Sequence, residues 1–132
     1  MALLVCPSCQ MGKMGSEDGL SVNTKLKIGD KLYGEKFYYD AADYYQKILD
    51  VEPNNVDVTF KLAEAQFYSR DYLKAEVNYK KVVENSNKRV DFYFPTARYQ
   101  YALTLKKNRK YDEAKSEFKT FINFSLLYKS FG

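Results

Sequence analysis

The 132-residue chain contains no histidine and no tryptophan, and it has only two cysteines and three prolines. The absence of histidine excludes serine–histidine catalytic triads, histidine general bases and histidine-containing metal sites. No uninterrupted apolar run approaches the roughly 18 residues that a membrane-spanning helix needs, so we expect no transmembrane segment. Cys6 and Cys9 form a single C-x-x-C pair, and a structural zinc site would need further ligands from a second chain.

Several motifs of catalysis are missing as well, namely phosphate-binding loops, nucleotide-binding glycine patterns and nucleophile elbows. The carboxylates are numerous but alternate with lysines, as in Asp40, Asp43, Lys47 and Asp50, which is typical of solvated helix surfaces. We therefore predict that the chain is not an enzyme and that it holds no cofactor and no metal ion.

What the chain does have is enough apolar material for one folded domain, with 45% hydrophobic and 29% charged residues. Thirteen tyrosines and nine phenylalanines supply large rings for a core. The formal net charge is +4, and residues 95–132 carry the excess, with eight Lys and Arg against three Asp and Glu. This composition excludes collagen-like and disordered chains.

Residues 1–21 do not share the pattern of the rest, since the first twenty hold both cysteines, all three methionines and three glycines. We predict a disordered leader or a remnant here. A redox dithiol would require a strand before the C-x-x-C pair, and none is visible. A lipid-modified Cys6 would require a longer, positively charged signal peptide before it. That alternative stays open only if the start of the sequence is truncated.

Beyond the leader, five series of residues recur with steps of 34 and then 39 positions. The series are Gly29, Ala63 and Ala102; Tyr38, Tyr72 and Tyr111; Ala41, Ala75 and Ala114; Tyr45, Tyr79 and Phe118; and Ile48, Val82 and Phe121. A period of 34 residues is typical of a repeated helix–turn–helix unit.

Each repeat predicts two helices. The first helices are expected at about 24–34, 58–69 and 96–107, each with a small residue that lets its partner helix approach closely. The second helices are expected to open at the recurring tyrosine, and they carry apolar residues at helical spacing. No alternating strand pattern occurs, so the predicted fold class is all-α.

These repeats resemble tetratricopeptide (TPR) repeats, as shown by the segments GDKLYGEKFYYDAADYYQKILDVEPNN, LAEAQFYSRDYLKAEVNYKKVVE and YALTLKKNRKYDEAKSEFKTFI. The resemblance covers residues 22–124 and implies a right-handed α–α superhelix, or α-solenoid, of three repeats. The repeats lie at about 22–55, 56–89 and 95–124, and a short apolar tail follows at 125–132. The chain departs from the family pattern at Lys25, Thr59 and Arg98, where a large aromatic often begins the first helix.

A polar connection at 85–91 precedes the aromatic run Phe92, Tyr93, Phe94 and Pro95. Two interpretations stay open for this run: it packs against the preceding repeat, or it forms an exposed apolar ridge.

The segment FYFPTARYQYALTLKKNRKYDEAKSEF, taken with the preceding repeats, is also similar to the N-terminal repeat region of Bacteroidetes-type OmpA-like envelope lipoproteins, some of which belong to the type IX secretion apparatus. That similarity implies a periplasmic or outer-membrane-associated protein; without it the location is unknown and the cytoplasm is the alternative.

The TPR resemblance implies that the first helices line a concave groove that binds a peptide segment or a partner helix. The candidate groove residues are Leu26, Asp30, Tyr33, Phe60, Glu64, Phe67, Tyr68, Tyr99, Leu103 and Lys106, flanked by Asn23, Asp57 and Thr96. Chaperone-tail receptors of the family carry basic and Asn residues where this chain has Asp30, Glu64 and Leu103, which argues against that partner. The function predicted is a non-catalytic protein-binding scaffold.

A dense basic cluster, Lys106, Lys107, Arg109 and Lys110, lies at the turn inside the third repeat. Solvated turns often look like this. The alternative function is a cytoplasmic module that binds RNA or an acidic partner here, although RNA binding would favour a broader stripe.

The last helix ends in an apolar stretch where solenoids usually carry a polar capping helix. We therefore expect this edge to meet another subunit or further repeats.

Overall fold

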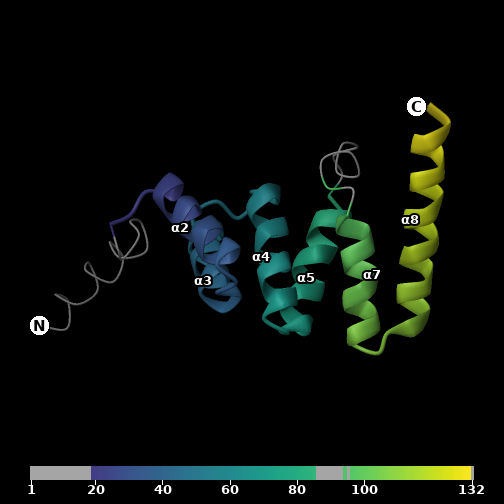
Figure 1. The fold of residues 1–132 in the computed structure, drawn as a ribbon, viewed down its shortest axis with the longest axis horizontal. Helices are drawn as coiled ribbons and strands as arrows, with labels where there is room; N and C mark the ends of the chain where they lie inside the picture. Colours follow the sequence, from purple (N-terminus) through teal and green to yellow (C-terminus); the bar gives the residue numbers. More distant parts are fainter. Residues whose placement is uncertain (1–18, 86–93, 95, 132) are drawn as a thin grey trace, which may run out of the picture.

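The computed structural model describes residues 19–85, 94 and 96–131, and this part of the chain forms six α-helices and no β-strand (Figure 1). The helices are α2 (Val22–Gly34), α3 (Tyr38–Leu49), α4 (Val56–Tyr68), α5 (Tyr72–Val83), α7 (Ala97–Lys107) and α8 (Tyr111–Phe131). Each helix packs against the next one in the chain, whereas helices further apart hardly touch. The helices therefore form a row, and the predicted all-α fold is confirmed for these residues.

Polar capping residues set where two of the first helices begin. The side chain of Ser21 accepts a hydrogen bond from the Thr24 amide, and the side chain of Asn55 accepts one from the Val58 amide. Both helices consequently start two residues before the expected positions 24 and 58. The second helices begin at the recurring tyrosines, as predicted.

The turn inside each hairpin has the same backbone conformation. Lys36, Arg70 and Arg109, which are related by the steps of 34 and 39, have φ values of 68°, 67° and 64°. In the second turn, the Asp71 amide donates to the Gln66 carbonyl and the Arg70 amide donates to the Phe67 carbonyl, which is the Schellman arrangement. The first and third turns repeat both bonds one period away. The local backbone thus follows the sequence period.

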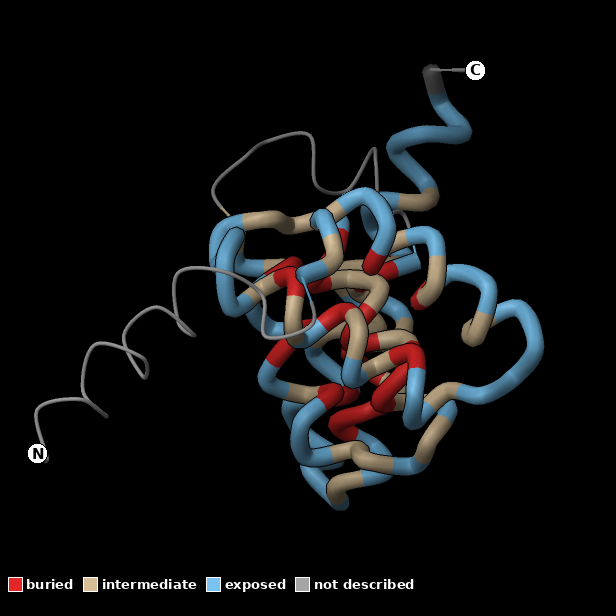
Figure 2. Tube along the Cα trace, turned by 90° about the vertical axis from the view of Figure 1, so that its left-hand side faces the viewer, coloured by how far each residue is buried: buried red, intermediate tan, exposed pale blue. Residues whose placement is uncertain are grey.

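The recurring alanine, aromatic and aliphatic positions of the second helices form the core of the first two hairpins (Figure 2). Their side chains are at most 1% exposed; they are Ala41, Tyr45, Ile48, Ala75, Tyr79 and Val82. In α8 the equivalent Phe118 and Phe121 are only half-buried. The difference arises because, within the described residues, no further helix covers α8.

The exposed end of α8 continues beyond the boundary expected at residue 124, so the predicted tail is helical as far as Phe131. Figure 1 shows this helix rising past the end of α7. Leu126, Leu127 and Tyr128 expose more than half of their surface, at 60%, 56% and 52%.

Phe94 packs its ring against Phe60, with centroids 5.0 Å apart, and lies against a small cluster formed by Val82 and Ala97. This contact agrees with the packing interpretation of the aromatic run. The other members of that run, and the Cys6–Cys9 pair, lie outside the described residues.

The two helices of the first hairpin approach each other closely at Gly29. A Cβ atom at this position would lie 2.8 Å from Cε1 of Tyr45. The Tyr45 ring is 1% exposed, and its hydroxyl donates a 2.8 Å hydrogen bond to Asp30. The ring is therefore held from both ends and has little freedom to move away.

We predict that Gly29→Ala lowers the free energy of unfolding by about 1–3 kcal/mol, because the added methyl group overpacks the α2–α3 contact. Gly34→Ala in the same helix is the matched control, since a Cβ there meets nothing within 4 Å. The control should be neutral or stabilising by up to about 1 kcal/mol through helix propensity. Urea denaturation followed by circular dichroism measures both, and equal effects would contradict the close contact.

Candidate functional site

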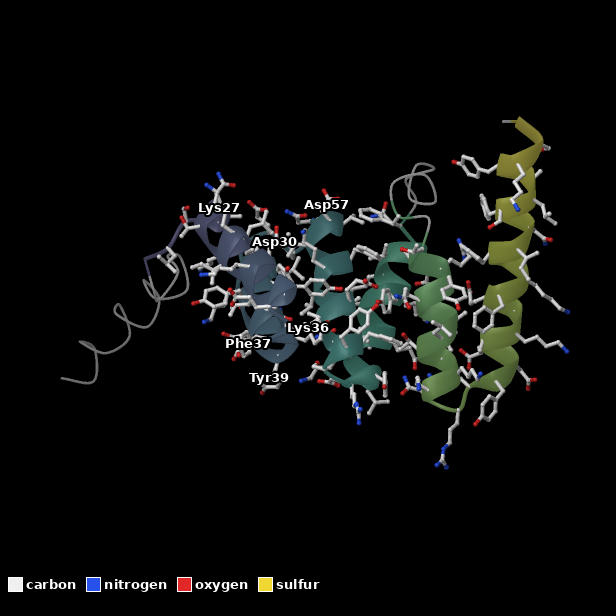
Figure 3. The ribbon with its side chains drawn as sticks, viewed as in Figure 1. Lys27, Asp30, Lys36, Phe37, Tyr39 and Asp57 are labelled. Carbon is white, nitrogen blue, oxygen red and sulfur yellow. The ribbon has the colours of Figure 1, made fainter. Side chains whose placement is uncertain are left out.

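A hollow of about 280 Å³ lies between the first two hairpins. It is lined by Asp30, Tyr33, Tyr45, Phe60, Lys61 and Glu64, and we call these six residues the inter-hairpin hollow. Figure 3 shows Asp30 on the side of the first hairpin that faces α4. Four of the ten predicted groove residues, Asp30, Tyr33, Phe60 and Glu64, are thus brought together from α2 and α4.

A cluster of tyrosine rings adjoins the inter-hairpin hollow. The Tyr33 ring packs edge-on against Tyr38 and Tyr68, with centroid distances of 5.3 and 6.3 Å, and Tyr38 stacks on Tyr68 at 5.1 Å. The predicted residue Phe67 contacts Tyr68 and Tyr72. These contacts make one continuous aromatic surface at the end of the first two hairpins.

The carboxylate of Asp30 joins three helices. The hydroxyl of Tyr45 in α3 donates to Asp30 Oδ1 in α2, and Lys61 Nζ in α4 lies 2.8 Å from the same oxygen. Burial, more than the hydrogen bond to Asp30, raises the pKa of Tyr45, so this phenol stays a donor.

Glu64 occupies the equivalent place one repeat later. The Tyr79 hydroxyl donates to Oε1 of Glu64, and the Tyr33 hydroxyl donates to Oε2 over 3.4 Å. The Gln100 side chain also hydrogen-bonds this carboxylate. Burial raises the pKa of Glu64, and the three hydrogen bonds only partly oppose it. Glu64 is therefore a partly desolvated acid whose hydrogen-bond partners in the described part of the chain are neutral.

The third repeat replaces this polar pair by apolar residues, because Leu103 stands at the Glu64 position and Phe118 at the Tyr79 position. The Tyr99 ring packs against Phe118 and Phe121, with centroids 5.6 and 5.4 Å apart. Lys106 lines a second, more apolar hollow of about 340 Å³ that includes Phe118. The predicted groove residues of this repeat therefore lie apart from the inter-hairpin hollow.

Two other predicted groove residues are half-buried and do not line the inter-hairpin hollow. Leu26 packs against the core of the first hairpin. Leu103 is half-buried in α7.

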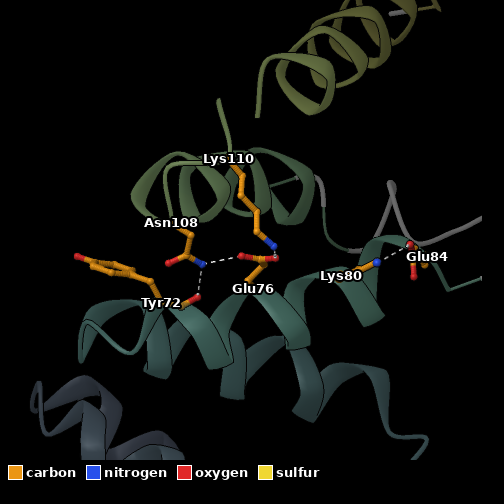
Figure 4. Close-up of polar contacts among 6 residues, drawn as sticks. All are labelled: Tyr72, Glu76, Lys80, Glu84, Asn108 and Lys110. Carbon is orange, nitrogen blue, oxygen red and sulfur yellow. Dashed lines mark hydrogen bonds and ion pairs between the residues drawn. The ribbon is translucent and has the colours of Figure 1, made fainter. Parts of the chain in front are cut away.

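The predicted basic cluster is partly neutralised by the second hairpin (Figure 4). Lys110 Nζ forms an ion pair with Glu76, and the Asn108 side chain donates to Glu76 over 2.6 Å and to the Tyr72 carbonyl over 3.0 Å. Lys107 lies over the Tyr72 ring, 5.7 Å from its centroid. All four cations of the cluster are exposed. The carboxylate of Glu76 offsets one of the four positive charges, which weakens the positive field that RNA binding would need. The neutral Tyr72 ring leaves the charge of Lys107 in place.

Sequence reasoning missed Tyr45, Tyr79, Lys61 and Gln100 as residues of this site. The repeat pattern could have indicated the two tyrosines, since Asp30 and Tyr45 are fifteen residues apart, as are Glu64 and Tyr79. In the third repeat both members of the pair change together, to Leu103 and Phe118. Such paired replacement indicates a contact.

No protein-family model matches the chain, and no curated protein is significantly similar to it. Function is therefore argued from the geometry above. In the part of the chain that the structure describes, no three His, Cys, Asp or Glu side chains gather as a metal site. The helices of that part also lack any segment long and apolar enough to cross a membrane.

We predict that Tyr79→Phe lowers the free energy of unfolding by about 1–3 kcal/mol, because it removes a donor from a partly buried carboxylate. Glu64→Leu alone should also destabilise, since it leaves the Tyr79 hydroxyl without its acceptor. The double variant reproduces the Leu103 and Phe118 pair of the third repeat, so its cost should fall below the sum of the single costs by about 0.5–3 kcal/mol. Additive costs in denaturant unfolding would rule out the coupling.

Replacing Glu64 or Glu76 by glutamine should change the free energy of unfolding in opposite directions at pH 7. Because the folded pKa of Glu64 is raised, its stability contribution is present below the ordinary glutamate pKa and is lost as the pH rises through the folded value. Glu64→Gln should therefore stabilise the protein at pH 7, and this gain should vanish near pH 4, about the unfolded pKa.

Glu76 is the matched comparison. Partial burial acts to raise its pKa, but hydrogen bonds from Lys110 and Asn108 prevail and lower it. Its stability contribution is present above the ordinary pKa and is lost as the pH falls through the lowered value. Glu76→Gln should destabilise at pH 7 and lose its effect in acid. Thermal melts across pH measure both variants, and effects of the same sign would refute the assignment.

Proposed function

We propose that this chain is a TPR protein, in which three helical hairpins stack as a right-handed superhelix and act as a non-catalytic scaffold. The face formed by α2, α4 and α7 binds a peptide segment or a helix of a partner protein. The observation that carries this proposal is the inter-hairpin hollow, where aromatic rings and charged groups from two repeats line one open surface. Such mixtures of rings and a few polar groups are typical of peptide-binding surfaces.

Two further features support the stacked arrangement. The hairpin turns repeat with the sequence period at Lys36, Arg70 and Arg109. Each hairpin also contacts the next without folding back on an earlier one. Stacked repeats of this kind offer an extended binding surface.

We further propose, on the resemblance to envelope lipoproteins described above, that the scaffold works within a bacterial envelope or secretion complex. Cell fractionation of the native organism tests this location, with recovery in the envelope fraction expected and recovery with cytoplasmic proteins as the contrary result.

Site-specific crosslinking tests the binding face. A photoreactive phenylalanine analogue is placed at Tyr68 or Tyr99, which expose 45% and 40% of their surface on the proposed face. The matched control position is Tyr39, which is 78% exposed at the lower end of the first hairpin in Figure 3. In native cells, the same discrete partner should crosslink at positions 68 and 99.

The control at Tyr39 should give no such product. Crosslinking of that partner at Tyr39 alone, or equally at all three positions, would show that the partner binds another face. Phe67→Ala combined with Tyr99→Ala should lower partner capture at least about tenfold, because truncated aromatic hot spots commonly cost more than 1 kcal/mol.

A further inference from the structure

Among the described residues, two carboxylates that connect neighbouring hairpins have cationic partners and a third does not. Asp30 pairs with Lys61 across the first and second hairpins, and Glu76 pairs with Lys110 across the second and third. Glu64 also lies between hairpins, but the described residues give it only tyrosine hydroxyls and an amide. It is the acid of the inter-hairpin hollow to which no cationic side chain among the described residues is paired.

The repeat period identifies the position from which a cationic partner of Glu64 would be expected. A step of 34 carries Asp30 to Glu64, and a step of 39 carries Lys61 to Gln100. The first acid therefore receives an ammonium group from the next first helix, whereas the second acid receives a neutral amide from the equivalent position. A partly buried carboxylate without a counter-charge is costly, and a cation delivered from outside would relieve that cost.

The geometry of the hollow suits one long side chain. Its volume of about 280 Å³ lies at the lower end of ligand pockets, and the rings of Tyr33 and Phe60 line it. Aromatic faces attract guanidinium and ammonium groups and also pack against their alkyl stems. Oε2 of Glu64 accepts a long 3.4 Å bond from Tyr33, and a stronger donor can compete with so long a bond.

We propose that the inter-hairpin hollow receives an arginine or lysine side chain of the bound peptide, with Glu64 as the carboxylate that pairs with it. This inference rests on the proposed function and specifies the chemistry of the partner. Lys61 does not oppose it strongly, because Asp30 already balances that ammonium group at 2.8 Å. Arginine is favoured over lysine because its planar fork can bind a carboxylate through two hydrogen bonds.

Peptide selection on the full-length chain tests this chemistry. A library of random peptides displayed on phage is selected in parallel on the wild type, on Glu64→Gln and on Glu76→Gln. Peptides from the wild type should be enriched in arginine and lysine relative to the library. The enrichment should persist with Glu76→Gln, whose native carboxylate already has Lys110, and should disappear with Glu64→Gln.

Affinity measurements then test the contact between Glu64 and the arginine of a selected peptide. Replacing the enriched arginine by glutamine in the best peptide should weaken binding to the wild type about tenfold, the loss of roughly 1.4 kcal/mol expected of such a contact. The same replacement should change binding to Glu64→Gln little. The variant Glu64→Leu combined with Tyr79→Phe, which copies the third repeat, also lacks the carboxylate, so the replacement should change its binding little as well.

The outcomes separate this inference from the proposed function. Selected peptides that lack basic residues, or that keep them on Glu64→Gln, would overturn the basic-side-chain inference while leaving peptide binding intact. Failure to select any peptide on the wild type would overturn the binding face and this inference with it.

Discussion

The close packing of the Tyr45 ring against Gly29 within the first hairpin is the constraint on which the rest of the structure depends. At Gly29 the backbone of α2 approaches the Tyr45 ring so closely that no side chain fits between them. The ring is long enough to cross this seam, and its hydroxyl therefore reaches Asp30 on the other helix. The same contact that closes the core thus also fixes a carboxylate of the candidate binding face.

This coupling of core and face makes the three repeats chemically unequal. In the first two hairpins, the hydroxyl of the core tyrosine donates a hydrogen bond to a carboxylate, that of Asp30 or Glu64. The third has no such hydroxyl and no such acid, because Phe118 and Leu103 replace them. Polar groups of the candidate binding face are consequently concentrated between the first and second hairpins, and the third has an apolar surface around Tyr99.

The period of the sequence was sufficient to predict the helices, because a repeated turn geometry ties helix starts to recurring residues such as Tyr38 and Tyr72. The network around Glu64 was not predicted, since its partners come from three other helices and depend on distances between hairpins. The deep burial of Lys25, which is 3% exposed, could not be predicted either, because the residue type alone favours solvent. The helices and turns within each repeat could therefore be predicted from the sequence, whereas the contacts between repeats could be found only in the structure.

The third hairpin provides different groups to the two acids of the second hairpin. Glu76 receives the ammonium group of Lys110 together with the amide of Asn108. Glu64, on the candidate binding face, receives the Gln100 amide from the described residues of that hairpin. An internal ion pair at Glu64 would have to be broken before a cationic ligand could enter, which would weaken binding by the energy of that pair. A neutral amide holds the carboxylate in place and leaves its charge available to a ligand.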